Sequence, residues 1–289
     1  MEVICLAEVE DVLGEGPIWH PTERALYWVD ALGCMIRRYT PQDGGVRSWP
    51  TPEPIGSLVF RADGGIIAGM KSGFRLVDLD SGTFETVADP QPGESILLND
   101  GKCDRRGRYW CGTMDMSLTK TAGILWRLDE DFSYHAMDQG ITVSNGIAWS
   151  PDDTVMYYAD TRAETVYAYD FNIEDGTVHN RRVFLSTADL PGRVDGATVD
   201  TEGGYWCAMI HAGYVARYTP DGEFDRKINL AVSHPTMCTF GGDNLDELYI
   251  TSATRFLDDE GRKTEPLAGA LFVVRDIGAK GLVEPFFAG

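Results

Sequence analysis

The sequence predicts an all-β fold, a six-bladed β-propeller in which four-stranded antiparallel blades surround a central channel. Three observations support this prediction. A phrase made of a Pro/Asp/Gly turn, a short apolar or aromatic strand, a polar gap and a second strand occurs six times. Its period of roughly 40–50 residues is the spacing of propeller blades. The 32 glycines provide the tight turns that such hairpins need.

The copies of this phrase follow one another along the chain and define the expected blades. They occupy residues 20–45, 61–82, 103–131, 150–176, 200–224 and 241–276. Their strands are short and rich in Tyr, Trp, Val and Ile, and Asp-Gly or Pro-Asp turns separate them. A doubly wound α/β fold would need long amphipathic helices, which the sequence lacks. A β-sandwich or two small β domains would not explain six similar units without a linker, so we expect one domain over residues 1–289.

Composition limits the classes of partner. The net charge of −20 repels phosphate backbones and anionic lipids, so we expect neither nucleic acid nor a membrane as a partner. The first residues do not form a secretory signal, and no apolar run reaches the ~18 residues of a membrane helix. The six cysteines are dispersed without a C-x-x-C pair, which indicates reduced thiols in a cytoplasmic protein.

Four segments place an oxygen-bearing side chain beside glycine, just before a blade's repeated phrase. They are LGEGPIW with Glu15, LLNDGKCD with Asn99 and Asp100, SNGIAWSPD with Asn145, and VDGATVD with Asp195. One Asn-Gly or Asp-Gly pair is usually only a turn, but here the pattern recurs in phase with the blades. Glu15, Asn145 and Asp195 together offer two carboxylates and an amide oxygen, a hard donor set that suits Ca²⁺, Mg²⁺ or Mn²⁺.

With these motifs, the chain resembles the SMP-30/gluconolactonase/luciferin-regenerating-like family of sugar lactonases along essentially its whole length. The longest matching motif is NDGKCDRRGRYWCGTM, and VDGATVDTEGGYW and PTMCTFGGDNLDELYITSA also match. The resemblance implies a six-bladed propeller with one axial metal ion held by Glu15, Asn145 and Asp195. It also implies that Asp195 is the general base and that Asn99 binds substrate or a metal-bound water. The ion stays open among calcium, magnesium, manganese, zinc and iron.

The departures from the family pattern concern substrate recognition. Many members carry an arginine two residues before the asparagine of the NDGK motif, and this chain has Leu97 there. Either another donor such as Arg162 or Arg193 replaces that arginine, or the pocket accepts a lactone that lacks a hydroxyl or differs in stereochemistry. His211 stands where other members often differ, and the sequence leaves open a substrate contact, a structural role or simple exposure.

These features predict a metal-dependent hydrolase that opens a sugar-acid lactone to an aldonic acid, with a small-molecule sugar lactone as its partner. Two alternatives remain at this stage. One is a phosphotriesterase-like hydrolase on the same axial metal, and the other is a calcium-binding or ligand-binding propeller with little turnover. The sequence does not decide the sugar or the oligomeric state. No G-x-S-x-G or G-x-G-x-x-G motif supports a serine hydrolase or a nucleotide cofactor.

Overall fold

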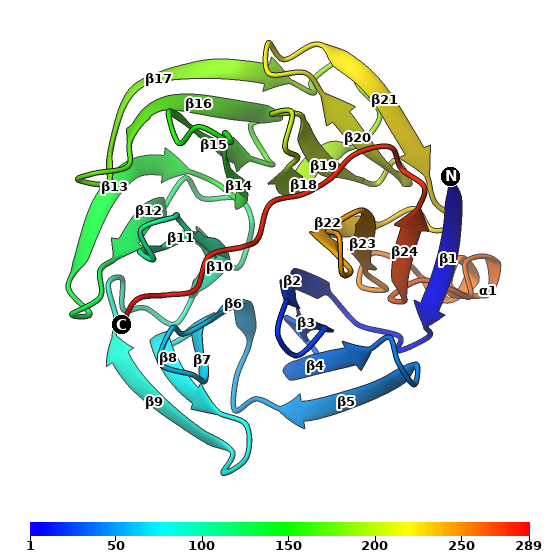
Figure 1. Cartoon of the computed structure of the whole chain (residues 1–289), viewed down its shortest axis with the longest axis horizontal. Coiled ribbons are helices and arrows are strands. Elements are labelled where there is room, and N and C mark those ends of the chain that lie inside the picture. The colour runs from blue at the N-terminus through cyan, green and yellow to red at the C-terminus, as the bar shows by residue number, and fades with distance from the viewer.

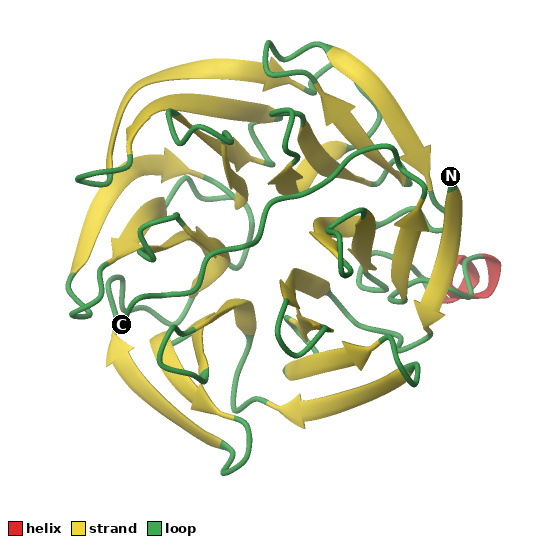
Figure 2. Cartoon of the chain, viewed as in Figure 1, coloured by secondary structure: helices red, strands yellow, loops and turns green.

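Six four-stranded antiparallel sheets form a ring in the computed structural model, which describes residues 1–289 (Figure 1). The predicted six-bladed β-propeller is therefore confirmed. Strands and turns make up almost the whole molecule, and the only helix is the short α1 (Asp259–Thr264) at the edge of the ring (Figure 2). No helix in the molecule has the length and apolarity needed to span a membrane.

The first three blades follow the chain in order, and the first strand of each is innermost. They consist of β2 (Gly14–His20), β3 (Ala25–Asp30), β4 (Met35–Thr40) and β5 (Gly45–Pro50); β6 (Ile55–Phe60), β7 (Ile66–Met70), β8 (Gly73–Asp78) and β9 (Thr83–Ala88); and β10 (Ile96–Cys103), β11 (Tyr109–Asp115), β12 (Gly123–Leu128) and β13 (Tyr134–Ile141).

The other three blades repeat this arrangement. They consist of β14 (Ser144–Trp149), β15 (Val155–Asp160), β16 (Thr165–Asn172) and β17 (Thr177–Ser186); β18 (Arg193–Val199), β19 (Tyr205–Ile210), β20 (Tyr214–Tyr218) and β21 (Phe224–Asn229); and β22 (Pro235–Gly241), β23 (Glu247–Ser252) and β24 (Leu271–Arg275), with β1 (Glu2–Ala7) as the fourth strand. The antiparallel pairing of β1 with β24 joins the two ends of the chain and closes the ring.

A C-terminal strap, residues 277–289, runs across one face of the ring over the channel (Figure 1). Its backbone bonds to several blades, for example from Phe287 N–H to the Phe60 carbonyl at 2.8 Å and from Thr201 N–H to the Lys280 carbonyl at 2.8 Å. The Phe287 side chain is fully buried in the largest apolar cluster. The strap therefore contributes to the core as well as covering the channel.

Two tryptophans that recur at similar places in the repeat, Trp110 and Trp206, pack in the apolar core of the blades. Trp110 and Trp206 are fully buried, and the indole N–H of each donates to a buried aspartate, Asp104 at 2.8 Å and Asp200 at 2.7 Å. Burial without such a partner would leave the indole N–H unsatisfied. All six cysteines are free thiols, in agreement with the reduced state expected from their spacing.

Candidate functional site

A pocket opens at the end of the channel where the innermost strands begin. Together with the solvent at its open mouth, the pocket encloses about 550 Å³. The four residues predicted from the sequence, Glu15, Asn99, Asn145 and Asp195, all line it. The other lining residues are Leu13, Met114, Leu118, Val143, Thr161, Arg162, Arg193, Ile210, His211, Arg255 and Phe256.

β-Bulges direct these side chains into the channel. The register of each innermost strand shifts at its site residue, between Glu15 and Ile18 in β2, between Asn145 and Ala148 in β14, and between Val194 and Ala197 in β18. A bulge bends a strand and changes the direction of a side chain. Gly146 follows Asn145 with a φ of +63°, and a Cβ atom there would lie 2.4 Å from the Tyr205 hydroxyl. Gly146 therefore permits the close approach of β14 to Tyr205 of β19 in the next blade.

Glu15 and Asp195 form a pair of carboxylates that the protein alone does not satisfy. Both are almost fully buried, and neither accepts a hydrogen bond from a side chain. Burial, followed by the charges of Asp195 and Asp100, raises the pKa of Glu15 well above its usual range. Burial and then Asp100 likewise raise the pKa of Asp195. A bound cation would relieve both effects, because it supplies the missing positive charge and ligand contacts.

The amide of Asn145 is held in one orientation beside this pair. Its Nδ2 donates to the Thr161 hydroxyl at 2.8 Å, and that hydroxyl donates to the Val194 carbonyl at 2.8 Å. Its Oδ1 accepts from Asn99 Nδ2 at 3.0 Å. Nitrogen is thus engaged with Thr161, which leaves the amide oxygen as the group available to a cation. The sequence analysis did not identify Thr161, because it lies after β15 and outside the four motifs.

This donor set fits a hard divalent cation. It contains two carboxylates and one oriented amide oxygen, and their charge balances one such ion. Nowhere in the molecule, the axis included, are three His, Cys, Asp or Glu side chains grouped so as to hold a metal by themselves. Any ion at the axis therefore depends on the Asn145 oxygen as well as on Glu15 and Asp195.

Asp100, next to Asn99 in β10, lies outside the pocket lining and deeper along the channel. Its Oδ2 accepts from Ile147 N–H at 3.0 Å, while its buried Oδ1 has no partner. Burial raises the pKa of Asp100 to about 6. Asp100 therefore adds negative charge beneath the Glu15–Asp195 pair.

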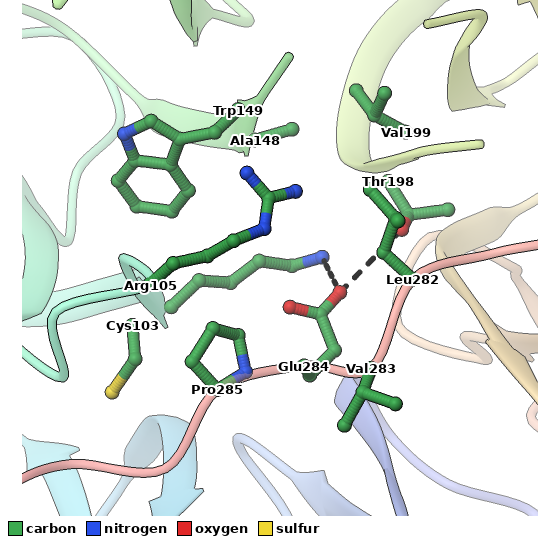
Figure 3. Close-up of a pocket in the computed structure, with 11 residues that line it drawn as sticks. Cys103, Arg105, Ala148, Trp149, Thr198, Val199, Leu282, Val283, Glu284 and Pro285 are labelled. Carbon is green, nitrogen blue, oxygen red and sulfur yellow. Dashed lines mark hydrogen bonds and ion pairs between the residues drawn. The ribbon is translucent and has the colours of Figure 1, made fainter. Parts of the chain in front are cut away.

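The strap closes the other end of the channel. Lys102, at the far end of β10, donates to Glu284 of the strap at 2.8 Å, and Thr198 of β18 approaches the same oxygen at 3.5 Å. Figure 3 shows Glu284 and Pro285 of the strap beside Arg105 in a second, smaller cavity at this end. Only the end that contains Glu15 and Asp195 is thus an open pocket with a carboxylate pair.

The pocket has two walls of opposite character. One is apolar and includes Met114, Leu118 and Val143, with Leu97 buried behind it in the same small apolar cluster. The other wall carries Arg162, Arg193, His211 and Arg255. The arginine that many similar proteins have at position 97 is thus replaced by an apolar cluster, and the arginines of this chain lie on a different wall.

The comparisons with known proteins agree with this architecture. The family model of the SMP-30/gluconolactonase/LRE-like region matches residues 13–254. The chain belongs to the SMP-30/gluconolactonase/LRE-like family.

Individual relatives of this family cover nearly the whole chain. A 6-deoxy-6-sulfogluconolactonase of Pseudomonas putida is 37% identical over 99% of this chain and 98% of its own length. A pentonolactonase of Haloferax volcanii is 34% identical over 98% and 97%. The crystal structure of a calcium-binding protein, regucalcin, from Agrobacterium tumefaciens superimposes with a TM-score of 0.95 at 26% identity, over 99% of this chain and 97% of that one.

In this SMP-30/gluconolactonase/LRE-like chain, sequence reasoning identified Glu15, Asn99, Asn145 and Asp195 and named Arg162, Arg193 and His211 as candidates, but it missed the apolar wall and the residues after β23. Arg255 and Phe256 lie in the loop that follows β23, and no motif marks them. His211, whose role the sequence left open, lies at the pocket mouth with its ring centroid 5.0 Å from that of Phe256. A signal was nevertheless present, because these residues lie in the loops that follow the second strand of a blade, at the same end of the channel as the motifs.

Proposed function

We propose that the protein hydrolyses a sugar lactone to its open-chain aldonic acid with one divalent cation held by Glu15, Asn145 and Asp195. One observation chiefly supports this proposal: two buried carboxylates without side-chain donors face an open pocket beside an oriented amide oxygen. Relatives named for lactonase activity, among them the enzymes of P. putida and H. volcanii, support the reaction class. The regucalcin named as calcium-binding supports the cation.

Each residue of the site has a separate role in the opening of the lactone ring. A bound divalent cation supplies Lewis acidity, which polarises the lactone carbonyl and stabilises negative charge on its oxygen. Asp195 holds the attacking water and accepts its proton as the new carbon–oxygen bond forms. The bond from the carbonyl carbon to the ring oxygen then breaks, and the ring oxygen takes the proton that Asp195 accepted and leaves as an alcohol. Asn99 uses its Nδ2 for Ser144 and Asn145, so its Oδ1 is free to accept from water or a substrate hydroxyl.

A lactone panel tests this function directly. Purified protein is treated with chelator, supplied with single divalent cations, and assayed in weak buffer for acid release from five- and six-carbon aldonolactones. We expect acidification well above the uncatalysed rate that depends on the cation. Acid release from phosphotriesters alone would indicate the phosphotriesterase-like alternative. Cation binding with no acidification from any substrate would indicate a calcium-binding protein.

Single substitutions test which residues bind the cation and which take part in catalysis. Glu15→Gln, Asn145→Ala and Asp195→Asn should each weaken cation binding in calorimetric titrations. Glu284→Gln is the matched control, because its carboxylate lies at the closed end of the channel. Loss of a general base costs about 10²–10⁴-fold in kcat, so Asp195→Asn should lower kcat more than Asn99→Ala. Parent-like titrations for all three variants would place the ion elsewhere, and parent-like kcat for Asp195→Asn at saturating cation would remove it from the mechanism.

A further inference from the structure

The cationic wall of the pocket holds positive charge that the protein does not neutralise. Arg162 and Arg255 take part in no ion pair, although the chain as a whole carries a net charge of −20. Arg193 pairs with Glu164 through its Nε at 2.9 Å, which leaves its outer N–H groups free. An arginine that lines a pocket without a carboxylate partner presents a planar set of donors suited to an anion.

These arginines belong to one continuous arc. Arg162 follows β15, Arg193 begins β18, and Arg255 follows β23, so they come from three successive blades. His211 lines the same pocket directly after β19, and partial burial, then His234 and the charges of Arg193 and Arg162, lower its pKa. Phe256 extends the arc, with its ring 5.0 Å from His211 and 5.6 Å from the Arg255 guanidinium carbon.

The axial carboxylates do not account for this positive charge. No ion pair joins Arg162, Arg193 or Arg255 to Glu15 or Asp195, and the one carboxylate partner among the three arginines is Glu164, which pairs with Arg193. The carboxylate pair and the arginine arc are therefore separate charged regions of one pocket. A ligand that spans the pocket would place its lactone carbonyl at the first region and its far end at the second.

The apolar wall limits which chemical group the ligand can carry at the end remote from its lactone carbonyl. Met114, Leu118 and Val143 carry no hydrogen-bond donor for sugar hydroxyls, and Leu97 behind them adds none. Recognition of a fully hydroxylated sugar terminus would need such donors, because a buried hydroxyl without a partner is costly. The free donors of this pocket are concentrated in the arginine arc.

From this arrangement we infer that the lactone carries an anionic group, a sulfonate, phosphate or carboxylate, at the end remote from its carbonyl, and that Arg162, Arg193 and Arg255 bind it. The inference rests on the proposed function and specifies its substrate class. The shared chemistry is a terminal anion bound by several guanidinium N–H groups. Arg162, Arg193 and Arg255 are then the residues that set specificity.

Binding of open-chain sugar acids tests the inference without turnover. Gluconate is compared by calorimetry with its counterparts that carry a sulfonate, a phosphate or a carboxylate at carbon 6, on full-length protein in excess Mg²⁺. All four share the carboxylate at carbon 1, so only the far end differs. At least one of the three should bind about 10- to 100-fold more tightly than gluconate, the range expected for charge-assisted hydrogen bonds. The order among them identifies the anion.

Arginine variants locate the binding groups. Arg162→Gln and Arg255→Gln should each reduce the preference over gluconate at least about tenfold. The matched control is Arg262→Gln, because Arg262 is exposed on α1, lines no part of the pocket and has no ion pair. The control should keep the full preference.

Failure of this inference is distinguishable from failure of the proposed function. Equal affinity for gluconate and all three doubly anionic acids would overturn the inference, even if neutral lactones are hydrolysed rapidly. A preference that survives in both Arg162→Gln and Arg255→Gln would overturn the assignment to the arc. Absence of hydrolysis of any lactone would remove the proposed function, while an arginine-dependent preference among the acids would still support an anion-binding pocket.

Discussion

At the scale of single residues, the orientation of one amide decides which atom the axial site offers to a cation. Thr161 accepts from Asn145 Nδ2 and donates to the Val194 carbonyl, so its hydroxyl connects the innermost strands β14 and β18. Without that acceptor, the amide could rotate and present nitrogen to the ion. Thr161 touches no reacting atom in this account and acts as a positioning residue through Asn145.

Thr161→Val should therefore weaken cation affinity about 10- to 100-fold, the usual effect of losing a group that orients a metal ligand. Valine keeps the shape of threonine, so the loss would reflect the hydroxyl rather than a cavity. Thr161→Ser is the rescue variant, because serine retains the acceptor and donor, and it should titrate close to the parent. Equal affinities for the valine and serine variants would show that Asn145 is oriented by other contacts.

At the scale of elements, the bulged innermost strands place the site residues, and glycine permits the bulges to pack. Gly146 combines a φ of +63° with a position where a Cβ atom would meet the Tyr205 hydroxyl at 2.4 Å. That hydroxyl, on the second strand of the next blade (β19), donates to the Gly146 carbonyl at 2.9 Å, so β14 is hydrogen-bonded to that blade as well as close to it. A side chain here would push β14 away from β18 and separate Asn145 from Asp195.

We expect Gly146→Ala to lower the free energy of unfolding by about 1 kcal/mol from the left-handed backbone and by about 1–3 kcal/mol more from the clash. Gly44→Ala is the matched control, since Gly44 has a φ of +69° in an exposed turn with open space around it. Urea denaturation of the two variants separates the cost of the left-handed backbone, which both variants share, from the cost of the steric clash, which only Gly146→Ala has. If both variants lose the same stability, close approach of the strands is not what requires glycine at position 146.

The same strands show how much of the fold could be predicted from the sequence. The second and third strands of each blade were predictable because they are buried, aromatic and bounded by Asp-Gly turns. Outer strands such as β13 and β17 are exposed and rich in polar residues, so their sequences resemble loops. The pairing of β1 with β24 was not predictable, because it joins residues from opposite ends of the chain. In the site, the motifs identified four residues that line one pocket, whereas Thr161, Arg255 and Phe256 lie in loops whose positions depend on the assembled ring.

At the scale of the whole molecule, two devices hold the ring together. β1 supplies the fourth strand of the blade that contains the end of the chain, so this blade is complete only when both ends meet. The strap then crosses the face opposite the pocket and bonds to separate blades, and it covers the channel there. Because the carboxylate pair and the arginine arc lie at the other end of the channel, the strap contributes to stability without lining the candidate site.

This separation predicts that the strap can be weakened without loss of binding. Phe287 is fully buried, and Phe287→Ala should lower the free energy of unfolding by about 3–5 kcal/mol because it leaves a large cavity in the core. Val283 lies on the same strap but is 54% exposed, so Val283→Ala should change stability by no more than about 0.5 kcal/mol. Chemical denaturation measures both effects, and calorimetry at a temperature where both variants are folded should give parent-like affinities for the cation and for the sugar acids. Equal stability of the two variants would mean that the strap lies on the ring without supporting it. A loss of ligand affinity in folded Phe287→Ala would mean instead that the closed end of the channel is coupled to the pocket through the innermost strands.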